Sequence, residues 1–173
     1  AGDRSEERTH RGPSARALSA RDVRTGREAG RRMAIRPALL DLNLLAALFW
    51  PSHEHHAVAH DWFNQRHVDK WATCPLTQLG FVRLVSNPAF SRDALSVRDA
   101  LTLLLKNLEH PDHVFWSADR DAASLTPTRG HQQVTDAYLL ALAHHHGGLV
   151  ATFDRGLGDF AAQLGVAIDV VAT

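Results

Sequence analysis

The chain has 173 residues, 45% of them hydrophobic and 22% charged, which predicts one globular domain with a core of ordinary size. Its 19 Lys and Arg residues balance its 19 Asp and Glu residues, so a broad basic surface for nucleic acid is not expected. The single cysteine, Cys74, excludes an internal disulfide framework, and the lack of a long apolar run or hydrophobic leader favours a cytoplasmic protein with no membrane anchor.

Residues 1–32 differ in composition from the rest of the chain. They hold nine Arg and five acidic residues but only two large aliphatic residues, so they cannot bury enough apolar surface to fold alone. We expect an Arg-rich tail that is disordered or artificially added, or a piece of a binding partner that docks as a short basic helix. Met33 is the only Met and stands where the composition changes, so the folded domain is expected to begin there and to span residues 33–173.

Short apolar runs alternate with helical patterns from Met33 onward. The apolar runs predict strands, and apolar residues at helical spacing predict helices that end at Pro or Gly. In chain order the expected elements are strand 38–42, helix 43–50, helix 53–67, strand 71–74, helix 76–85, helix 97–109, strand 113–116, helix 134–146, strand 149–153 and strand 166–171. In helix 97–109 four leucines are expected to face the core, namely Leu101, Leu104, Leu105 and Leu108. The alternation predicts an α/β fold, a mostly parallel sheet of about five strands with helices on both faces.

Three aspartates stand where such a sheet would present a functional site. Asp41 and Asp154 each follow an apolar run, and Asp136 lies early in a predicted helix. Ligands of open α/β sheets bind beyond the carboxyl ends of the strands. Each acid alone is explained as a helix cap or turn residue. Together, however, buried acids at one sheet edge repel one another, and a divalent cation would resolve both the repulsion and the desolvation.

The histidines form two clusters, at 53–56 and 144–146. Neighbours on a helix point apart, so the histidines of 144–146 are not expected to bind one metal ion together, and a helix C-terminus accounts for them. His56 and His60, one turn apart, have the spacing for a metal but no obvious third ligand. His131 is most simply a loop residue, Cys74 a packed apolar residue, and the four tryptophans core or interface residues.

Five segments in this order resemble the PIN domain, close to the VapC toxins of toxin–antitoxin pairs. They are residues 39–45 (LLDLNLL), 50–56 (WPSHEHH), 77–88 (TQLGFVRLVSNP), 130–143 (GHQQVTDAYLLALA) and 149–157 (LVATFDRGL). The resemblance covers the body of the chain and leaves residues 1–32 outside. It implies a three-layer fold and a ribonuclease that depends on Mg²⁺ or Mn²⁺. It also implies an RNA substrate, a homodimer and a small cognate antitoxin protein that occludes the site.

The resemblance also assigns the site residues. Its acids fall on Asp41, Asp136 and Asp154 as metal ligands and catalytic residues, whereas its usual Glu falls on Gln78, which leaves the site one charge short. Three explanations stay open. Gln78 is a natural variant that binds metal more weakly, or an engineered replacement that blunts a toxic enzyme, or another acid, such as Asp119 or Asp159, supplies the charge.

Three further residues are candidates near these acids. Asn43 and Thr152 flank them and are expected to support the metal ligands, and Thr152 shares a strand side with Asp154. Arg83 is a candidate RNA contact, although an exposed Arg or a carboxylate partner explains it equally. The preferred hypothesis is a metal-dependent endoribonuclease toxin that hydrolyses RNA phosphodiesters. The alternative is a PIN-like module that binds RNA or protein and is catalytically weakened by Gln78.

Overall fold

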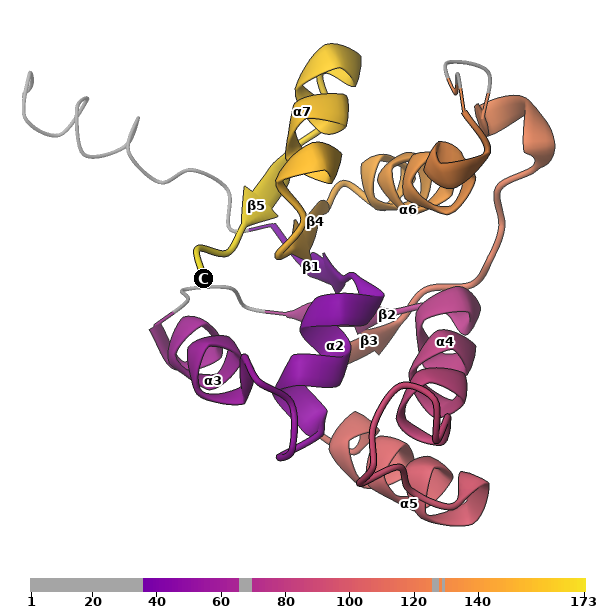
Figure 1. Ribbon diagram of the computed structural model, residues 1–173. Helices are drawn as coiled ribbons and strands as arrows, with labels where there is room; N and C mark the ends of the chain where they lie inside the picture. The colour runs from indigo at the N-terminus through magenta and orange to yellow at the C-terminus, as the bar shows by residue number, and fades with distance from the viewer. Residues whose placement is uncertain (1–35, 66–69, 126–127, 129) are drawn as a thin grey trace, which may run out of the picture. The chain divides into compact units, whose positions relative to one another are not determined.

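The computed structural model describes residues 36–65, 70–125, 128 and 130–173 (Figure 1). The main elements are β1 (Ala38–Leu40), α2 (Leu42–Phe49), α3 (His56–Gln65), β2 (Trp71–Thr73), α4 (Pro75–Val85), α5 (Val97–Leu108), β3 (His113–Phe115), α6 (Val134–His145), β4 (Leu149–Thr152), α7 (Arg155–Leu164) and β5 (Ile168–Val170). Two short 3₁₀ turns, Ala122–Leu125 and His131–Gln133, precede α6. The tail predicted at 1–32 and the domain start at Met33 lie outside the described residues, so that division of the chain stays a prediction.

The five strands form one sheet in the order β3-β2-β1-β4-β5, and every neighbouring pair is parallel. The central pair aligns Leu39 with Val150 and Leu40 with Ala151. Because the strands are parallel, their carboxyl ends share one edge, and Asp41 and Asp154 follow two adjacent strands there. The α/β fold with a parallel sheet of five strands is therefore confirmed.

Helices cover both faces of the sheet, which makes three layers (Figure 1). On one face α2, α3, α4 and α5 enclose a core that includes Leu45, Phe49, Trp71, Phe81 and Leu104. On the other face α6 and α7 enclose a second core that includes Leu39, Trp116, Leu140, Val150 and Phe160. Both faces of the central strands are thus buried, which explains why these strands appear in the sequence as continuous apolar runs.

The start of β4 comes unusually close to other parts of the chain. Gly148 precedes this strand, and a Cβ at that position would lie 2.5 Å from the Pro37 carbonyl oxygen and 2.5 Å from the Trp116 ring. The next amide, Leu149 N–H, donates to the same Pro37 carbonyl at 3.0 Å. Glycine therefore allows β4 to enter the sheet beside β1, and this contact helps to fix which residues of the two strands face each other.

Two predictions about the helices were wrong. The sequence analysis missed α7, which buries Leu157, Phe160 and Ala161 and begins at Asp154. In α5, Leu104 is buried, whereas Leu101 and Leu105 are 43% and 59% exposed. The core-facing side of α5 is displaced from the predicted one: Ala100 is buried beside Leu104, and Leu103 and the predicted Leu108 pack against the same core.

No helix within the described part of the chain is long and apolar enough to cross a membrane.

Candidate active site

Asp41 ends β1 and begins α2, and its carboxylate is held from two sides. Its backbone N–H donates to Ala151 at 2.9 Å, which extends the pairing of β1 with β4 by one residue. One carboxylate oxygen, Oδ1, accepts from the Leu42 N–H at 2.6 Å. The other, Oδ2, accepts from the Thr152 hydroxyl at 2.9 Å. The Asp41 side chain is only 8% exposed, so its orientation is set by the sheet and by the first turn of α2.

Thr152 connects Asp41 to Asp154. The Thr152 side chain is fully buried, and its hydroxyl oxygen accepts from the Asp154 N–H at 3.0 Å while its proton is given to Asp41. Asp154 caps α7, and its Oδ1 accepts from Gly156 N–H at 2.7 Å and Leu157 N–H at 3.3 Å. One buried hydroxyl therefore fixes the spacing between two acids at the ends of adjacent strands.

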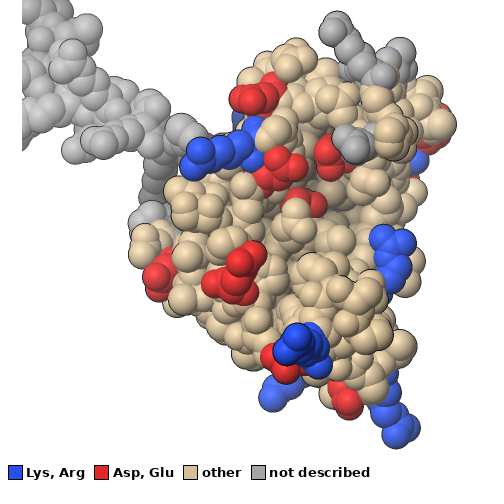
Figure 2. Space-filling view, in the orientation of Figure 1, with Lys and Arg blue, Asp and Glu red and all other residues tan. Residues whose placement is uncertain are grey.

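The three aspartates act on one another electrostatically. Burial raises the pKa of Asp41 above its ordinary value, and Asp154 raises it further, whereas the bonds from Thr152 and Leu42 oppose the rise. Burial also raises the pKa of Asp136, with additional contributions from Asp41 and Asp154. Figure 2 shows acidic side chains grouped near the middle of the face that is seen in Figure 1. The cluster concentrates negative charge that the other described side chains do not neutralise by an ion pair.

The aspartate cluster is open rather than a closed cage. Among the described residues, the one set of three His, Cys, Asp or Glu ligand atoms within 4.8 Å of one another belongs to Asp119, His145 and His146, away from Asp41. An ion such as Mg²⁺ keeps several water ligands in proteins, so an open set of carboxylates is compatible with it. The ligand atoms offered are oxygens only, and burial, with a smaller contribution from the neighbouring acids, raises the pKa of Asp41 and the pKa of Asp136.

A cavity of about 400 Å³ lies beside Asp41. Its walls come from the start of α2, one face of α4 and the start of α6, and they include Asp41, Leu76, Gly80, Arg83 and Thr135. Arg83 is exposed and presents the cationic side chain of this wall. The cavity therefore combines a buried acid, an arginine and apolar side chains within one hollow.

Gln78 faces a different neighbour from the one that the resemblance implies. Its amide Nε2 donates to the Thr73 hydroxyl at 2.8 Å, and the same hydroxyl lies 2.8 Å from Nε2 of His113. Burial lowers the pKa of His113, which keeps this ring neutral. Gln78 is absent from the residues that line the cavity beside Asp41. The reason is helical spacing, because Leu76, Gly80 and Arg83 form one face of α4 and Gln78 lies on another.

Of the other residues predicted for the site, one contacts Asp41 and the rest are exposed. Thr152 contacts Asp41 directly, as its position in β4 suggested, whereas Asn43 is exposed on the first turn of α2. Asp159 is exposed on α7, and Asp119 lies beside two histidines instead of the aspartates. His131 is exposed in the turn before α6.

The sequence analysis did not find Thr73 or Thr135. The available signal for Thr73 was its place at the end of a strand, the same place that Thr152 occupies in β4. Thr135 precedes Asp136 and lines the cavity, and nothing in the sequence distinguished it from an ordinary residue of a helix start. Both are small polar residues whose roles depend on neighbours that are remote in sequence.

The first histidine cluster has a structural role. His56 Nδ1 lies 2.7 Å from the Ala47 carbonyl oxygen, and His60 Nε2 lies 3.0 Å from the Leu48 carbonyl oxygen. These carbonyls belong to the last turn of α2, which has no intrahelical partners for them. The pair therefore caps the C-terminal end of that helix.

The chain is similar in sequence to a known family and to proteins of that family. The family model described as "PIN domain" matches residues 38–163. Ribonuclease VapC39 of Mycobacterium tuberculosis (strain ATCC 25618 / H37Rv) is 40% identical over 135 residues, which cover 72% of this chain and 94% of that protein. Ribonuclease VapC38 of the same strain is 41% identical over 128 residues, covering 73% and 91%. A crystal structure of FitAcB from Neisseria gonorrhoeae is similar with 21% identity and a TM-score of 0.46, over 76% of this chain and 96% of that one.

Proposed function

Because the chain belongs to the PIN domain family, we propose that it is a metal-dependent endoribonuclease, the toxin of a toxin–antitoxin pair, which hydrolyses RNA phosphodiesters. The observation that carries the proposal is the buried carboxylate of Asp41, whose pKa is raised by burial and further by Asp154. A fold that holds repelling carboxylates together is suited to a divalent cation. The relatives named Ribonuclease VapC, 40% and 41% identical, support the nuclease activity.

Asp41, Asp136 and Asp154 would hold the ion. Their carboxylate oxygens are hard ligands, which favour Mg²⁺ or Mn²⁺ over softer metals. When bound, such an ion activates a water molecule and stabilises the charge that develops on the phosphate.

The chain's own contribution is to fix the acids before any ligand arrives. The Thr152 hydroxyl and the Leu42 N–H hold the two oxygens of Asp41, at 2.9 Å and 2.6 Å. Asp154 is held by two amides at the start of α7. Since a misplacement of about 1 Å can lower a rate by orders of magnitude, this support is a functional requirement as well as a structural one.

The cavity beside Asp41 is the proposed place for the RNA backbone. Arg83 lines it and can donate two parallel hydrogen bonds to a phosphate. Thr135 lines the same cavity, and its hydroxyl is a second donor available to the phosphate. The whole chain has no net charge, so this local arginine and the bound cation, rather than a basic surface, would attract the phosphate.

A second candidate function follows from Gln78. Its amide is used by Thr73, and it supplies no negative charge to the aspartate cluster. If the three remaining acids bind the cation too weakly, the protein would be a PIN-like module that binds RNA or protein without cutting. An RNA cleavage assay separates the two functions, because such a module binds RNA and leaves it intact.

The remaining parts of the proposal concern partners. We propose a homodimer, a cognate antitoxin protein that covers the aspartate cluster, and action in the cytoplasm, where the RNA substrate is found. Exposed apolar side chains on α4 and α5, such as Leu79 at 72% and Leu105 at 59%, support protein contacts on that side. Residues 33–173 are the proposed nuclease domain, and residues 1–32 a separate tail that is disordered, added or derived from an antitoxin.

The test is an RNA cleavage assay with the purified chain. We expect internal cleavage of a labelled RNA in Mg²⁺ or Mn²⁺, no cleavage in EDTA, and a rate lower by roughly 100-fold or more for Asp41→Asn. The matched control is Asp61→Asn, an exposed acid on α3, which should leave the rate unchanged. Cleavage that survives both EDTA and Asp41→Asn would refute the proposed mechanism.

A further inference from the structure

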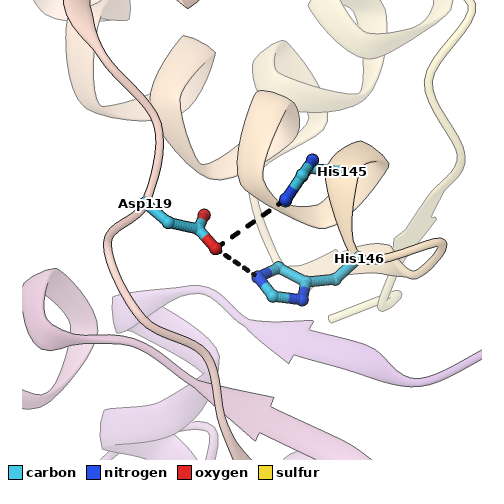
Figure 3. Close-up of side chains that lie close together, drawn as sticks. All are labelled: Asp119, His145 and His146. Atoms are coloured by element: carbon cyan, nitrogen blue, oxygen red, sulfur yellow. Dashed lines mark ion pairs between the residues drawn. The ribbon is translucent and has the colours of Figure 1, made fainter.

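Asp119, His145 and His146 form a second cluster of side chains of metal-ligand type at the C-terminal end of α6 (Figure 3), whereas Asp136 lies in the first turn of that helix. Nε2 of His145 and Nε2 of His146 lie 3.7 Å and 3.6 Å from the same oxygen, Oδ2 of Asp119. The three ligand atoms all lie within 4.8 Å of one another. Along α6 the cluster is nine residues from Asp136, or about 14 Å at 1.5 Å per residue, so it is separate from the aspartate cluster.

The sequence analysis expected the neighbouring histidines of 144–146 to point apart, but one nitrogen of His145 and one of His146 lie within 4.8 Å of each other and of an Asp119 oxygen. The prediction assumed that the helix continues through His146. Instead α6 ends at His145, and His146 is the C-cap, followed by Gly147 with φ of 67°. Both rings point toward Asp119 (Figure 3).

The His146 ring is fixed in place but incompletely bonded. It stacks on Trp116 with ring centres 4.6 Å apart and planes inclined by 10°. Its Nε2 is buried and makes no hydrogen bond with the described residues, since 3.6 Å to Asp119 is too long for one. Buried polar atoms are nearly always satisfied, so a buried nitrogen that meets a carboxylate only at 3.6 Å is suited to a cation bound between the two.

We propose that Asp119, His145 and His146 bind a Zn²⁺ ion, with a fourth position open to water. Zn²⁺ takes nitrogen and oxygen ligands at about 2.0–2.1 Å, which places tetrahedral ligand atoms roughly 3.3 Å apart. The two distances to Asp119 are 3.7 Å and 3.6 Å, and all three atoms lie within 4.8 Å of one another, so binding draws the three side chains together. Two imidazoles favour zinc over the hard ions that carboxylates alone select.

The ion would tie the segment after β3 to the end of α6. Asp119 lies in that segment, and both histidines lie at the helix end. Because the ion binds the folded arrangement and not the unfolded chain, it should raise the melting temperature as its concentration increases.

Arg120 lies where it disfavours the binding of a cation by this site. Its guanidinium lies 3.4 Å from Nδ1 of His145. The guanidinium carries a positive charge and only donates hydrogen bonds, so it repels a cation and occupies the nitrogen that must hold the proton when Nε2 binds a metal. Removal of this side chain should therefore strengthen metal binding. A simple histidine–aspartate ion pair with no metal would show no such gain.

The experiment is a calorimetric titration of the full chain with ZnCl₂, repeated with CoCl₂ to record the visible absorption of tetrahedral Co²⁺. We expect one ion per chain at this site, at least tenfold weaker binding in Asp119→Asn and in His146→Phe, and about threefold tighter binding in Arg120→Ala. Phe keeps a ring against Trp116, and Asp119 is exposed, so both variants should fold. His144→Ala, one residue away on the same helix, is the matched control and should bind as the parent does.

Asp41→Asn distinguishes this site from the proposed nuclease site and should leave Zn²⁺ binding unchanged. Loss of binding in Asp41→Asn, equal loss in His144→Ala and His146→Phe, or unchanged binding in Asp119→Asn would each overturn the proposal. A tetrahedral Co²⁺ spectrum that disappears in Asp119→Asn and persists in Asp41→Asn would support it.

Discussion

Replacing Thr152 by Val should destabilise the protein in a manner that depends on pH. The side chain is fully buried and nearly the same size as Val, so the main loss is the hydroxyl. That hydroxyl donates to Asp41 at 2.9 Å and accepts from the Asp154 N–H at 3.0 Å. The first bond stabilises the ionised carboxylate of Asp41. Its loss should therefore lower the free energy of unfolding most at pH values where Asp41 is charged.

The expected magnitude follows from the two bonds. A hydrogen bond to a charged group contributes about 1.5–3 kcal/mol and a neutral one about 0.5–1.5 kcal/mol. The free energy of unfolding of Thr152→Val should therefore fall by about 2–4 kcal/mol at pH 7.5. For a domain of this size each kcal/mol corresponds to roughly 3 °C, so the melting temperature should fall by about 6–12 °C.

The sign of the pH effect follows from the pKa of Asp41. Burial raises this pKa in the folded protein, so the charge destabilises the fold at neutral pH, and this penalty disappears as pH falls through the raised pKa toward the ordinary value of 3.8. The bond from Thr152 lowers the pKa, and without it the pKa of Asp41 rises further. Acidification should therefore raise the free energy of unfolding of Thr152→Val more than that of the parent protein. The difference in free energy of unfolding between the two proteins should become smaller as the pH falls below neutral.

The measurement is urea unfolding of both proteins in EDTA at pH 7.5 and at pH 5. Thr152→Ser is the control, because it keeps the hydroxyl and loses only a methyl group, and it should lose about 1 kcal/mol at both pH values. Equal losses in Val and Ser variants, or a Val deficit that is the same at both pH values, would refute the assignment of this hydroxyl to the Asp41 carboxylate.

Three other changes have defined outcomes. Gln78→Glu should leave Mn²⁺ affinity nearly unchanged, because Gln78 bonds to Thr73 and lies on another face of α4 than the residues beside Asp41, and a calorimetric gain of about tenfold, or 1.4 kcal/mol, would instead place position 78 at the metal. Deletion of residues 1–32 should leave the circular dichroism spectrum and melting temperature of the remainder unchanged, whereas an insoluble product would contradict the proposed division. Gly148→Ala should lower the free energy of unfolding by about 1–3 kcal/mol, because the new Cβ would lie 2.5 Å from the Pro37 carbonyl oxygen, and thermal melting would detect this.

The sheet and most helices could be predicted because their apolar patterns are strong. The continuous run of β1 and the stop at Pro51 gave the right element types. The helix α7 was missed because Gly156 and Gly158 weaken its propensity. Its buried residues nevertheless recur at helical spacing, at Leu157 and Phe160, so the signal was present in the sequence.

The site was only partly accessible from the sequence for a different reason. Two of the acids could be placed because they follow strands of a parallel sheet, where topology alone decides which edge they share. The direction of Gln78 could not be placed, because it depends on a bond to Thr73 across the start of α4. The approach of His145 and His146 to Asp119 could not be predicted, because Asp119 lies in a segment more than twenty residues earlier in the sequence and only the fold brings it to them.

The pairing of β1 with β4 also determines which insertions and deletions the chain can accept. Leu40 lies opposite Ala151, and Asp41 and Thr152 are the next residue on each strand. Side chains of a strand alternate between its two faces, so one residue inserted into β1 would turn the carboxylate of Asp41 toward the α2 side of the sheet, away from Thr152. A gain or loss of one residue there should erase the aspartate cluster even if the fold survives. Length changes in the loop between α4 and α5 would leave this pairing as it is.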